Sequence, residues 1–389
     1  TCSLLAAQLL ARLQRKSAVV GTLGYGVLDA TALAPMAQQV SALHSTGLTT
    51  PDPIALQRIL AELVNDGAAS IAIEVSSHSL QQKRVANVNV HTAIFTNLTQ
   101  DHLDYHGDLI SYGNAKAQLL QAPGLHTAIF NLDDDWAKSL LGKVPAGVNA
   151  LSYSTKIAAD IYAQDIELNA FGVTAHLVTP WGEAKIQSPL LGEFNLSNLL
   201  AVIAAVAVQG FALDAIVACV PDLLPAPGRM QQVVVDQQAQ QVQVIVDYAH
   251  TPDALENTLR AIQQHKAGNI WTVFGCGGDR DRGKRPLMAE VVERLADGVL
   301  VTDDNPRSEA PEQIFNDIRA GFANPEAVQF VHGRGQAIAQ LVAAASADDV
   351  LVLAGKGHED YQEIHGERQP FSDLIEAGKA LAVWEVAHA

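Results

Sequence analysis

Three polar segments in the second half of the chain each follow an apolar run that predicts a β-strand. These segments are Gly275–Pro286, Asp303–Arg307 and Gly355–Asp360. Ligands of open parallel sheets sit beyond the carboxyl ends of the strands, so the three segments would present Arg280, Arg307 and Glu359 to one crevice. Two guanidiniums and a carboxylate suit a zwitterionic ligand such as an amino acid.

The first of these segments combines glycines with cationic side chains. Glycine lets the backbone approach a ligand closely at the end of a strand. The segment contains no Gly-x-Gly-x-x-Gly, so the dinucleotide-binding fingerprint is absent. Its basic residues are Arg280, Arg282, Lys284 and Arg285. We interpret them as an anion-binding site; the alternative is a basic loop that only faces solvent.

Carboxylates and a histidine follow predicted strands in the first half. Glu74 closes a buried strand, where a carboxylate can hold Mg²⁺, a cation that prefers oxygen ligands. The same position also suits a solvated strand end, and both interpretations stay open. Asp101 and Asp104 flank His102 after another strand, and a histidine among carboxylates there favours a metal or a phosphate. The pattern around Lys116 assigns that residue no role by itself.

The elements that must position these residues alternate between strands and helices. This alternation predicts an α/β protein with a parallel sheet in each half. In the first half we expect strands at 17–20, 70–75, 90–95 and 128–130, helices at 2–13, 53–66 and 198–209, a glycine loop at 21–26 and antiparallel strands within 162–190. In the second half, a doubly wound domain, we expect strands at 243–246, 270–274, 298–302, 327–331 and 350–353. A proline-rich connector at 221–227 places the domains at 1–226 and 227–389.

Composition excludes several classes of protein. The 389 residues carry a formal net charge of −17, which argues against general binding to nucleic acids or anionic membranes. The longest fully apolar run, 199–208, is about half a membrane span. The three cysteines form no Cys-x-x-Cys pair, so we expect neither a disulfide framework nor a cysteine zinc site, and a reducing cytoplasm fits best.

Taken together, these motifs resemble the Mur ligase family of ATP-dependent amino-acid ligases. The most specific segments, all in the family's order, are 74–78, 101–107, 192–198, 247–253, 275–286, 304–307 and 355–361. The resemblance runs through essentially the whole chain. It implies a central parallel-sheet ATPase domain of the P-loop type over 1–226. A Rossmann-like C-terminal domain that binds the incoming amino acid would follow over 227–389.

The resemblance also implies an ATPase centre that uses ATP and Mg²⁺. Glu74 and His102 match the family's Mg²⁺ ligands, and Lys116 matches a lysine that the family carries as a carbamate. A neutral amine that captures CO₂ becomes an anion, which can support a second Mg²⁺. The residues that match the nucleotide side of the family site are Asn195, Asn198, Arg229, Asp247 and His250.

Two further residue sets match substrate positions of the family. The set matching the UDP-muramoyl dipeptide site is Thr49, Thr50, Ser76, Gln82 and Arg84; Leu48 stands where relatives often place an asparagine. Asp304, Asn305, Pro306 and Arg307 match the diaminopimelate recognition motif, and its companions are Arg280, Gly355 and Glu359. In this motif Arg307 would hold the distal carboxylate of the ligand.

The implied reaction joins meso-diaminopimelate to the D-glutamate γ-carboxylate of UDP-N-acetylmuramoyl-L-alanyl-D-glutamate through an acyl phosphate. This is a step of cytoplasmic peptidoglycan precursor synthesis, and we expect a monomer without a membrane span or a nucleic-acid partner. The family's phosphate loop, Gly-Thr-Asn-Gly-Lys-Thr, would lie immediately before Thr1, and a small N-terminal domain would precede it. We therefore expect the chain as written to be inactive by itself.

Alternatives to this interpretation differ at identifiable residues. Folylpolyglutamate synthase shares the architecture, but the motif at 304–307 argues against it. A sister ligase that adds lysine is closer, and Arg307 separates the two. A non-catalytic binding protein is disfavoured for the full-length enzyme by the set Glu74, His102 and Lys116, but it would describe the chain as written, which lacks the phosphate loop. For Arg307 itself, the alternative is a purely structural pairing with a nearby acid such as Asp304 or Glu309.

Overall fold

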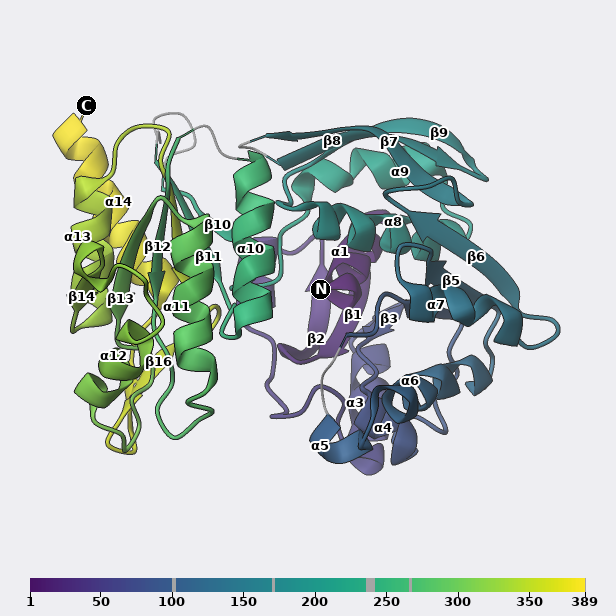
Figure 1. Cartoon of the computed structure of the whole chain (residues 1–389). Helices are drawn as coiled ribbons and strands as arrows, with labels where there is room; N and C mark the ends of the chain where they lie inside the picture. Colours follow the sequence, from purple (N-terminus) through teal and green to yellow (C-terminus); the bar gives the residue numbers. More distant parts are fainter. Residues whose placement is uncertain (100–102, 170–171, 236–241, 266–267, 389) are drawn as a thin grey trace. The chain divides into compact units, whose positions relative to one another are not determined.

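The computed structural model describes residues 1–99, 103–169, 172–235, 242–265 and 268–388 (Figure 1). The chain forms two compact units. The first unit contains Thr1–Glu167 and Val173–Leu224, and the second contains Leu168–Gly172 and Pro225–Ala389.

A small three-stranded sheet opens the first unit. Its order is β2 (Gly24–Asp29), β1 (Lys16–Gly21) and β3 (Ile71–Ile73), with β1 parallel to β3 and antiparallel to β2. The predicted glycine loop after residue 20 is therefore wrong. Gly21 pairs with Gly24 across a two-residue turn, and the chain returns as a strand of β-favouring residues such as Tyr25 and Val27.

A six-stranded sheet forms the other half of the first unit. Its strands, in spatial order, are β4 (Thr92–Phe95), β5 (Thr127–Asn131), β6 (Asn149–Ser154), β7 (Ile161–Asn169), β8 (Gly172–Thr179) and β9 (Gly182–Ser188). The strands from β4 to β7 pair in parallel, whereas β8 and β9 form an antiparallel hairpin. The prediction of antiparallel strands with a turn within 162–190 is thus confirmed for β8 and β9, while β7 begins in parallel with β6. The predicted single sheet of the first half is two sheets.

Helices fill the space between and around these two sheets. Helix α1 (Cys2–Gln14) lies on the small sheet, α8 (Glu193–Ala207) lies on the large one, and the two helices pack against each other. From Leu199 to its end, α8 is buried at every position, which explains the Ala/Val/Leu composition of this part on every face. Helix α3 (Pro53–Asn65) begins after Asp52, whose side chain caps it, and packs on the opposite face of the small sheet. The shorter helices are α2 (Met36–Ser41), α4 (Ser77–Gln81), α5 (Leu103–His106), α6 (Leu109–Ala117), α7 (Asp135–Ser139) and α9 (Leu213–Ala218).

The second unit is built on one mostly parallel sheet. Its spatial order is β10 (Gln231–Val233), β11 (Gln243–Asp247), β15 (Val350–Ala354), β12 (Ile270–Phe274), β13 (Gly298–Thr302) and β14 (Gln329–Val331), and only β10 pairs antiparallel. The predicted strand at 327–331 is shorter, because Pro325–Ala327 forms a 3₁₀ turn. Since β15 inserts beside β12, the carboxyl ends of β15, β12 and β13 are adjacent.

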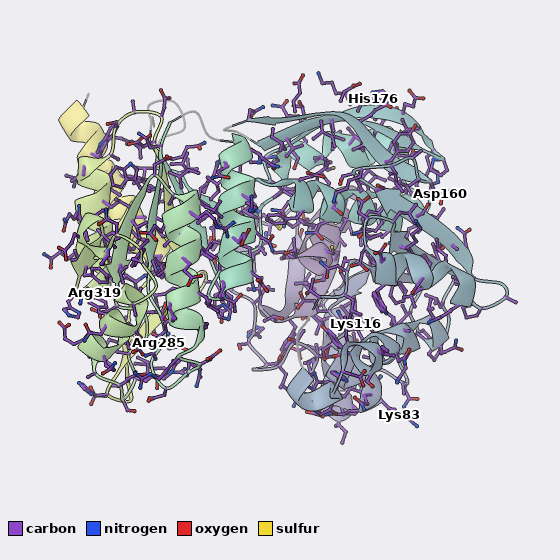
Figure 2. The ribbon with its side chains drawn as sticks, in the orientation of Figure 1. Lys83, Lys116, Asp160, His176, Arg285 and Arg319 are labelled. Carbon is purple, nitrogen blue, oxygen red and sulfur yellow. The ribbon has the colours of Figure 1, made fainter. Side chains whose placement is uncertain are left out.

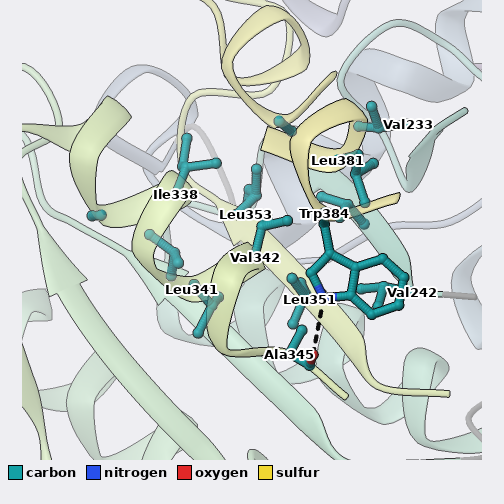
Figure 3. Packing of buried hydrophobic residues seen from close by; sticks show 14 of the residues in the cluster. Val233, Val242, Ile338, Leu341, Val342, Ala345, Leu351, Leu353, Leu381 and Trp384 are labelled. Atoms are coloured by element: carbon teal, nitrogen blue, oxygen red, sulfur yellow. Dashed lines mark hydrogen bonds between the residues drawn. The ribbon is translucent and has the colours of Figure 1, made fainter. Parts of the chain in front are cut away.

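Helices cover both faces of this sheet. Helices α10 (Pro252–His265), α11 (Lys284–Leu295) and α12 (Pro311–Arg319) form one layer, and α13 (Arg334–Ala344) with α14 (Asp373–His388) forms the other (Figure 1). Figure 3 shows the core under α13 and α14, where the buried Trp384 donates a hydrogen bond to the carbonyl of Ala345 at 3.1 Å. A hairpin of β16 (Tyr361–Ile364) and β17 (Glu367–Pro370) follows β15. Within the described part of the chain, no helix combines the length and apolar character needed to cross a bilayer.

Candidate active site

Glu74 is anchored at the end of β3 by the turn between β1 and β2. Its Oε2 accepts hydrogen bonds from the backbone N–H of Thr22 at 2.7 Å and from the Thr22 hydroxyl at 2.8 Å. A Cβ atom at Gly21 would lie 2.7 Å from the same oxygen, so a larger residue there would require the carboxylate to shift. The side chain is therefore held in one place.

The charge state of Glu74 suits a cation. Burial raises the pKa of the Glu74 carboxyl, and the hydrogen bonds that it accepts from Thr22 oppose this rise because they stabilise the ionised form. Oxygen ligands of this kind fit Mg²⁺. Among the described residues, no three His, Cys, Asp or Glu side chains cluster as a metal site.

Hydroxyl groups from two loops continue the polar contacts that begin at Glu74. The hydroxyls of Thr22 and Thr49 lie 3.1 Å apart, and the hydroxyl of Thr50 donates to the Glu74 carbonyl at 2.8 Å. Thr50 is buried, and its oxygen also accepts from the backbone N–H of Ser76 at 3.1 Å. Ser76 in turn caps the first turn of α4.

Arginine and glutamine side chains complete this network. Arg84 donates to the Thr50 carbonyl at 2.8 Å and, through two other nitrogens, to Oε1 of Gln82. Gln82 then donates to the Tyr105 hydroxyl at 3.1 Å. The structure therefore joins the five residues predicted for the muramoyl dipeptide and Glu74 into one continuous set of polar contacts. Sequence reasoning missed Thr22 and Tyr105; the second lies inside the quoted segment 101–107.

Lys116 lies near the end of α6, and Figure 2 labels it there. Its Nζ is 5.0 Å from the centre of the Tyr112 ring. The Tyr112 ring packs against His106, whose Nε2 is 2.9 Å from the Ser77 hydroxyl in α4. These contacts link the helix of Lys116 to the helix that follows Ser76. The predicted metal ligand His102 lies outside the described residues.

The predicted nucleotide residues divide between the two units. In the first unit, Asn195 is buried and its side chain donates to the Leu191 carbonyl at 2.7 Å, while the side-chain oxygen Oδ1 of Asn198 accepts from the Cys2 thiol at 3.2 Å. Both residues therefore stabilise the start of α8 and its contact with α1.

In the second unit, both carboxylate oxygens of Asp247 accept internal hydrogen bonds, from the backbone N–H groups of Met230 and Ala249 and from the Thr258 hydroxyl. Burial is the main reason that the pKa of Asp247 is raised, and these hydrogen bonds oppose the rise. The Arg229 guanidinium lies 4.7 Å from the centre of the Tyr248 ring. His250 Nδ1 is 2.8 Å from the Tyr248 carbonyl.

The loops after β12, β13 and β15 meet as the sequence predicts. The backbone N–H of Gly278 donates to the Asn305 carbonyl at 2.9 Å, and a Cβ atom at Gly278 would collide with the carbonyl of Pro306. A Cβ atom at Gly355, whose φ is +116°, would lie 2.9 Å from Oδ2 of Asp304. The glycines of these loops therefore serve the close approach of one loop to another.

Polar side chains of these loops contact each other. The Asn305 side chain donates to Glu359 at 2.8 Å, and Arg307 donates to the Gly278 carbonyl at 2.8 Å. Arg280 is exposed and donates only to the Asp279 carbonyl, at 3.2 Å, among the contacts of the described chain. Two residues that sequence reasoning passed over also lie here: Lys356, inside the quoted segment 355–361, and Glu363, which follows it.

The interpretation of the basic segment as four anion-binding cations needs a correction. Arg285, which Figure 2 labels, is fully buried and pairs with Glu309 at 2.7 Å and with Asp317 at 2.8 Å. Arg282 also pairs with Asp317, at 2.9 Å. Lys284 donates to the His250 carbonyl at 2.8 Å. The carboxylates of Glu309, just before α12, and of Asp317, within α12, neutralise the two arginines. The charge of these arginines is therefore not free for a ligand.

Family models and sequence relatives both match this chain to Mur ligases over nearly its whole length. Two family models match: the Mur ligase middle domain over residues 1–206, and the Mur ligase glutamate ligase domain over residues 228–357. The chain is 53% identical over 388 residues to the UDP-N-acetylmuramoyl-L-alanyl-D-glutamate--2,6-diaminopimelate ligase of Ectopseudomonas mendocina, covering 100% of the chain and 76% of that protein. It is 45% identical over 386 residues to the ligase of the same name from Coxiella burnetii, covering 98% of the chain and 76% of that protein.

Solved structures give the same answer. A structure of a UDP-N-acetylmuramoyl-L-alanyl-D-glutamate--2,6-diaminopimelate ligase matches with a TM-score of 0.75 and 41% identity, over 100% of this chain and 76% of that one. A folylpolyglutamate synthase from Mycobacterium tuberculosis matches with a TM-score of 0.68 and 17% identity, over 98% of this chain and 88% of that one. The second likeness concerns the fold alone.

Proposed function

The chain belongs to the Mur ligase family, and we propose that it joins meso-diaminopimelate to the D-glutamate γ-carboxylate of UDP-N-acetylmuramoyl-L-alanyl-D-glutamate. ATP would activate the γ-carboxylate as an acyl phosphate, and the amine of diaminopimelate would displace the phosphate to form the amide. The observation that carries this proposal is the 53% identity, over the whole chain, to a ligase of that name. We assign the ATPase to residues 1–226 and the amino-acid site to residues 227–389.

The first domain would bind the dipeptide substrate and ATP. The ionised Glu74 carboxylate would hold Mg²⁺ together with His102 and carbamylated Lys116. Mg²⁺, when bound, supplies positive charge that offsets the charge on the transferring phosphoryl group. Thr49, Thr50, Ser76, Gln82 and Arg84 would orient the dipeptide. Asn195 and Asn198 would meet the nucleotide, as would Arg229, Asp247 and His250 of the second domain.

The second domain would select the amino acid by its charges. Arg307 would hold the distal carboxylate with parallel hydrogen bonds, and Glu359 would hold an ammonium group. The remaining residues of the site would be Arg280, Asp304, Asn305, Pro306 and Gly355. Lysine lacks the distal carboxylate, so its binding would leave the Arg307 guanidinium without a partner in the ligand. This argument favours diaminopimelate over lysine as the substrate.

The function can be tested by turnover with the two amino acids. The chain, extended to the length of its relatives, is supplied with the UDP-muramoyl dipeptide and Mg·ATP, and kcat/KM is measured for meso-diaminopimelate and for lysine. We expect a preference for diaminopimelate of about a hundredfold or more, since lysine would lack the hydrogen bonds to Arg307, and a hydrogen bond to a charged group contributes about 1.5–3 kcal/mol. Equal rates would contradict the assignment of the amino acid. We further propose a monomeric, cytoplasmic enzyme without a nucleic-acid partner.

A further inference from the structure

A buried lysine lies among the loops of the amino-acid site. The Lys356 side chain follows the end of β15 and is 0% exposed. Its Nζ donates to Oδ1 of Asn305 at 3.1 Å and to Oε2 of Glu359 at 2.9 Å. A buried ammonium group is strongly destabilising unless it is paired and hydrogen-bonded. The position of Lys356 therefore depends on these two partners, and theirs depends on Lys356.

The three side chains form a closed triangle. Asn305 donates from Nδ2 to Oε2 of Glu359 at 2.8 Å, so each side chain contacts the other two. An ammonium group has only donors, so Lys356 requires the carbonyl side of the Asn305 amide and turns its NH₂ toward Glu359. The backbone N–H of Glu363 supports the same orientation by donating to Oδ1 at 2.9 Å.

Glu359 is the member of the triangle that reaches solvent. Its side chain is 19% exposed, whereas Asn305 is 2% exposed. Both hydrogen bonds to the carboxylate end on Oε2, and within the described residues Oε1 accepts none. A carboxylate with one oxygen anchored and the other available is oriented in advance for a cationic group of a ligand.

We propose that Lys356 is a positioning residue for amino-acid binding. It holds Asn305 and Glu359 in one orientation, so that the second oxygen of Glu359 meets the ammonium group of the incoming amino acid. This inference rests on the proposed function, because it takes Glu359 as a ligand contact. It assigns Lys356 no contact with the ligand and no part in the chemistry.

The first test separates amino-acid binding from the rest of catalysis. In the chain extended to the length of its relatives, K356M should raise the KM for meso-diaminopimelate about 10- to 100-fold, because even a small displacement of a binding group can weaken binding by this much. The KM values for ATP and the UDP-muramoyl dipeptide should stay unchanged. K379M is the matched control: Lys379 pairs with Glu376 at the same i,i+3 spacing and 2.8 Å, but its side chain is 68% exposed. K379M should leave all three KM values unchanged.

The second test asks whether Lys356 acts through Glu359. Binding of meso-diaminopimelate is measured by calorimetry for E359Q and for K356M/E359Q. If Lys356 acts by placing Glu359, the double variant should bind as E359Q does, because the group to be placed has already been lost. This comparison also holds if K356M alone fails to fold, since the double variant contains no unpaired buried carboxylate; circular dichroism checks the fold of each.

The outcomes separate the two proposals. Failure of the unaltered extended protein to bind or use meso-diaminopimelate overturns the proposed function and this inference with it. Normal use of diaminopimelate by both the unaltered protein and K356M overturns this inference alone. A double variant that binds the amino acid several-fold more weakly than E359Q also overturns it, because Lys356 would then act independently of Glu359.

Discussion

The guanidinium of Arg307 lies against the carboxylate of Glu363, with 3.4 Å between Nε and Oε2. The backbones of the two residues also pair, since the N–H of Arg307 donates to the Glu363 carbonyl at 3.0 Å. Among the described contacts, this acid, rather than Asp304 or Glu309, is the ion-pair partner of Arg307. The pairing uses Nε, and Nη1 donates to the Gly278 carbonyl, so these two contacts orient the guanidinium.

Replacing Arg307 should change the choice of amino acid. In Arg307→Ala we expect kcat/KM for meso-diaminopimelate to fall at least about a hundredfold, because the distal carboxylate loses a charge-assisted pair of hydrogen bonds. The value for lysine should stay the same or rise slightly. The measurement is kcat/KM for both amino acids in the chain extended to the length of its relatives.

Glu363→Gln serves as the control for that experiment. Glutamine retains a hydrogen-bond acceptor for Arg307, and the contact with Gly278 remains, so we expect a loss for diaminopimelate of less than about tenfold. An equal fall for both amino acids in Arg307→Ala would mean that the arginine is structural.

Lys116→Ala should abolish most of the activity, and short carboxylates should restore part of it. The hypothesis is that Lys116 acts as a carbamate, so acetate or formate could supply the missing anion beside Mg²⁺. The measurement is phosphate release with increasing acetate, with chloride at equal ionic strength as the control. A variant of near-normal rate, or one that no carboxylate stimulates, would contradict the carbamate role.

Gly113→Ala should disturb the helix that carries Lys116. A Cβ atom at Gly113 would lie 2.5 Å from Nε1 of Trp136 and 3.0 Å from a methyl group of Leu98. Overpacking of this kind costs about 1–3 kcal/mol, so we expect a lower Tm and a lower kcat. Gly142→Ala is the control, because no heavy atom lies within 4 Å of its added Cβ. Similar Tm and kcat values for the two variants would show that the contact with Trp136 does not position α6.

His332 should make the stability of the second unit depend on pH. Its hydrogen bond with Glu312, at 2.9 Å, is the main reason that its pKa is raised above the ordinary 6.5; partial burial opposes the rise, and Asp303 adds to it. A pKa that is higher in the folded state stabilises the protein fully below pH 6.5, and this contribution is lost as pH rises through the raised value.

The measurement is the Tm of the unaltered chain and of His332→Gln as a function of pH. We expect the Tm difference to be larger at about pH 5.5 than at about pH 8.5. The effect should be small, because the His332 side chain is 46% exposed. A Tm difference that does not change with pH would contradict the role of the protonated imidazole.

The sequence by itself determined which segments form the walls of the amino-acid site. The run 350–353 is apolar at every position and 270–274 at every position but Thr272, as expected for strands covered on both faces, so the polar residues that follow must lie at a strand end. This local rule placed Asn305, Arg307 and Glu359 correctly at the edge of one sheet. The rule uses only residues that are neighbours in sequence, because a strand that is buried on both faces consists of apolar residues.

Only the tertiary structure decided which of these polar groups meet. The insertion of β15 beside β12 brings Lys356 to Asn305, 51 residues apart in sequence, and the return of β16 brings Glu363 to Arg307. The same long-range packing turned Arg285 inward to Glu309 and split the strands of the first half into two sheets. Strand order and ion-pair partners depend on how segments that are distant in sequence pack against each other. The periodicity of a single segment carries no information about this packing.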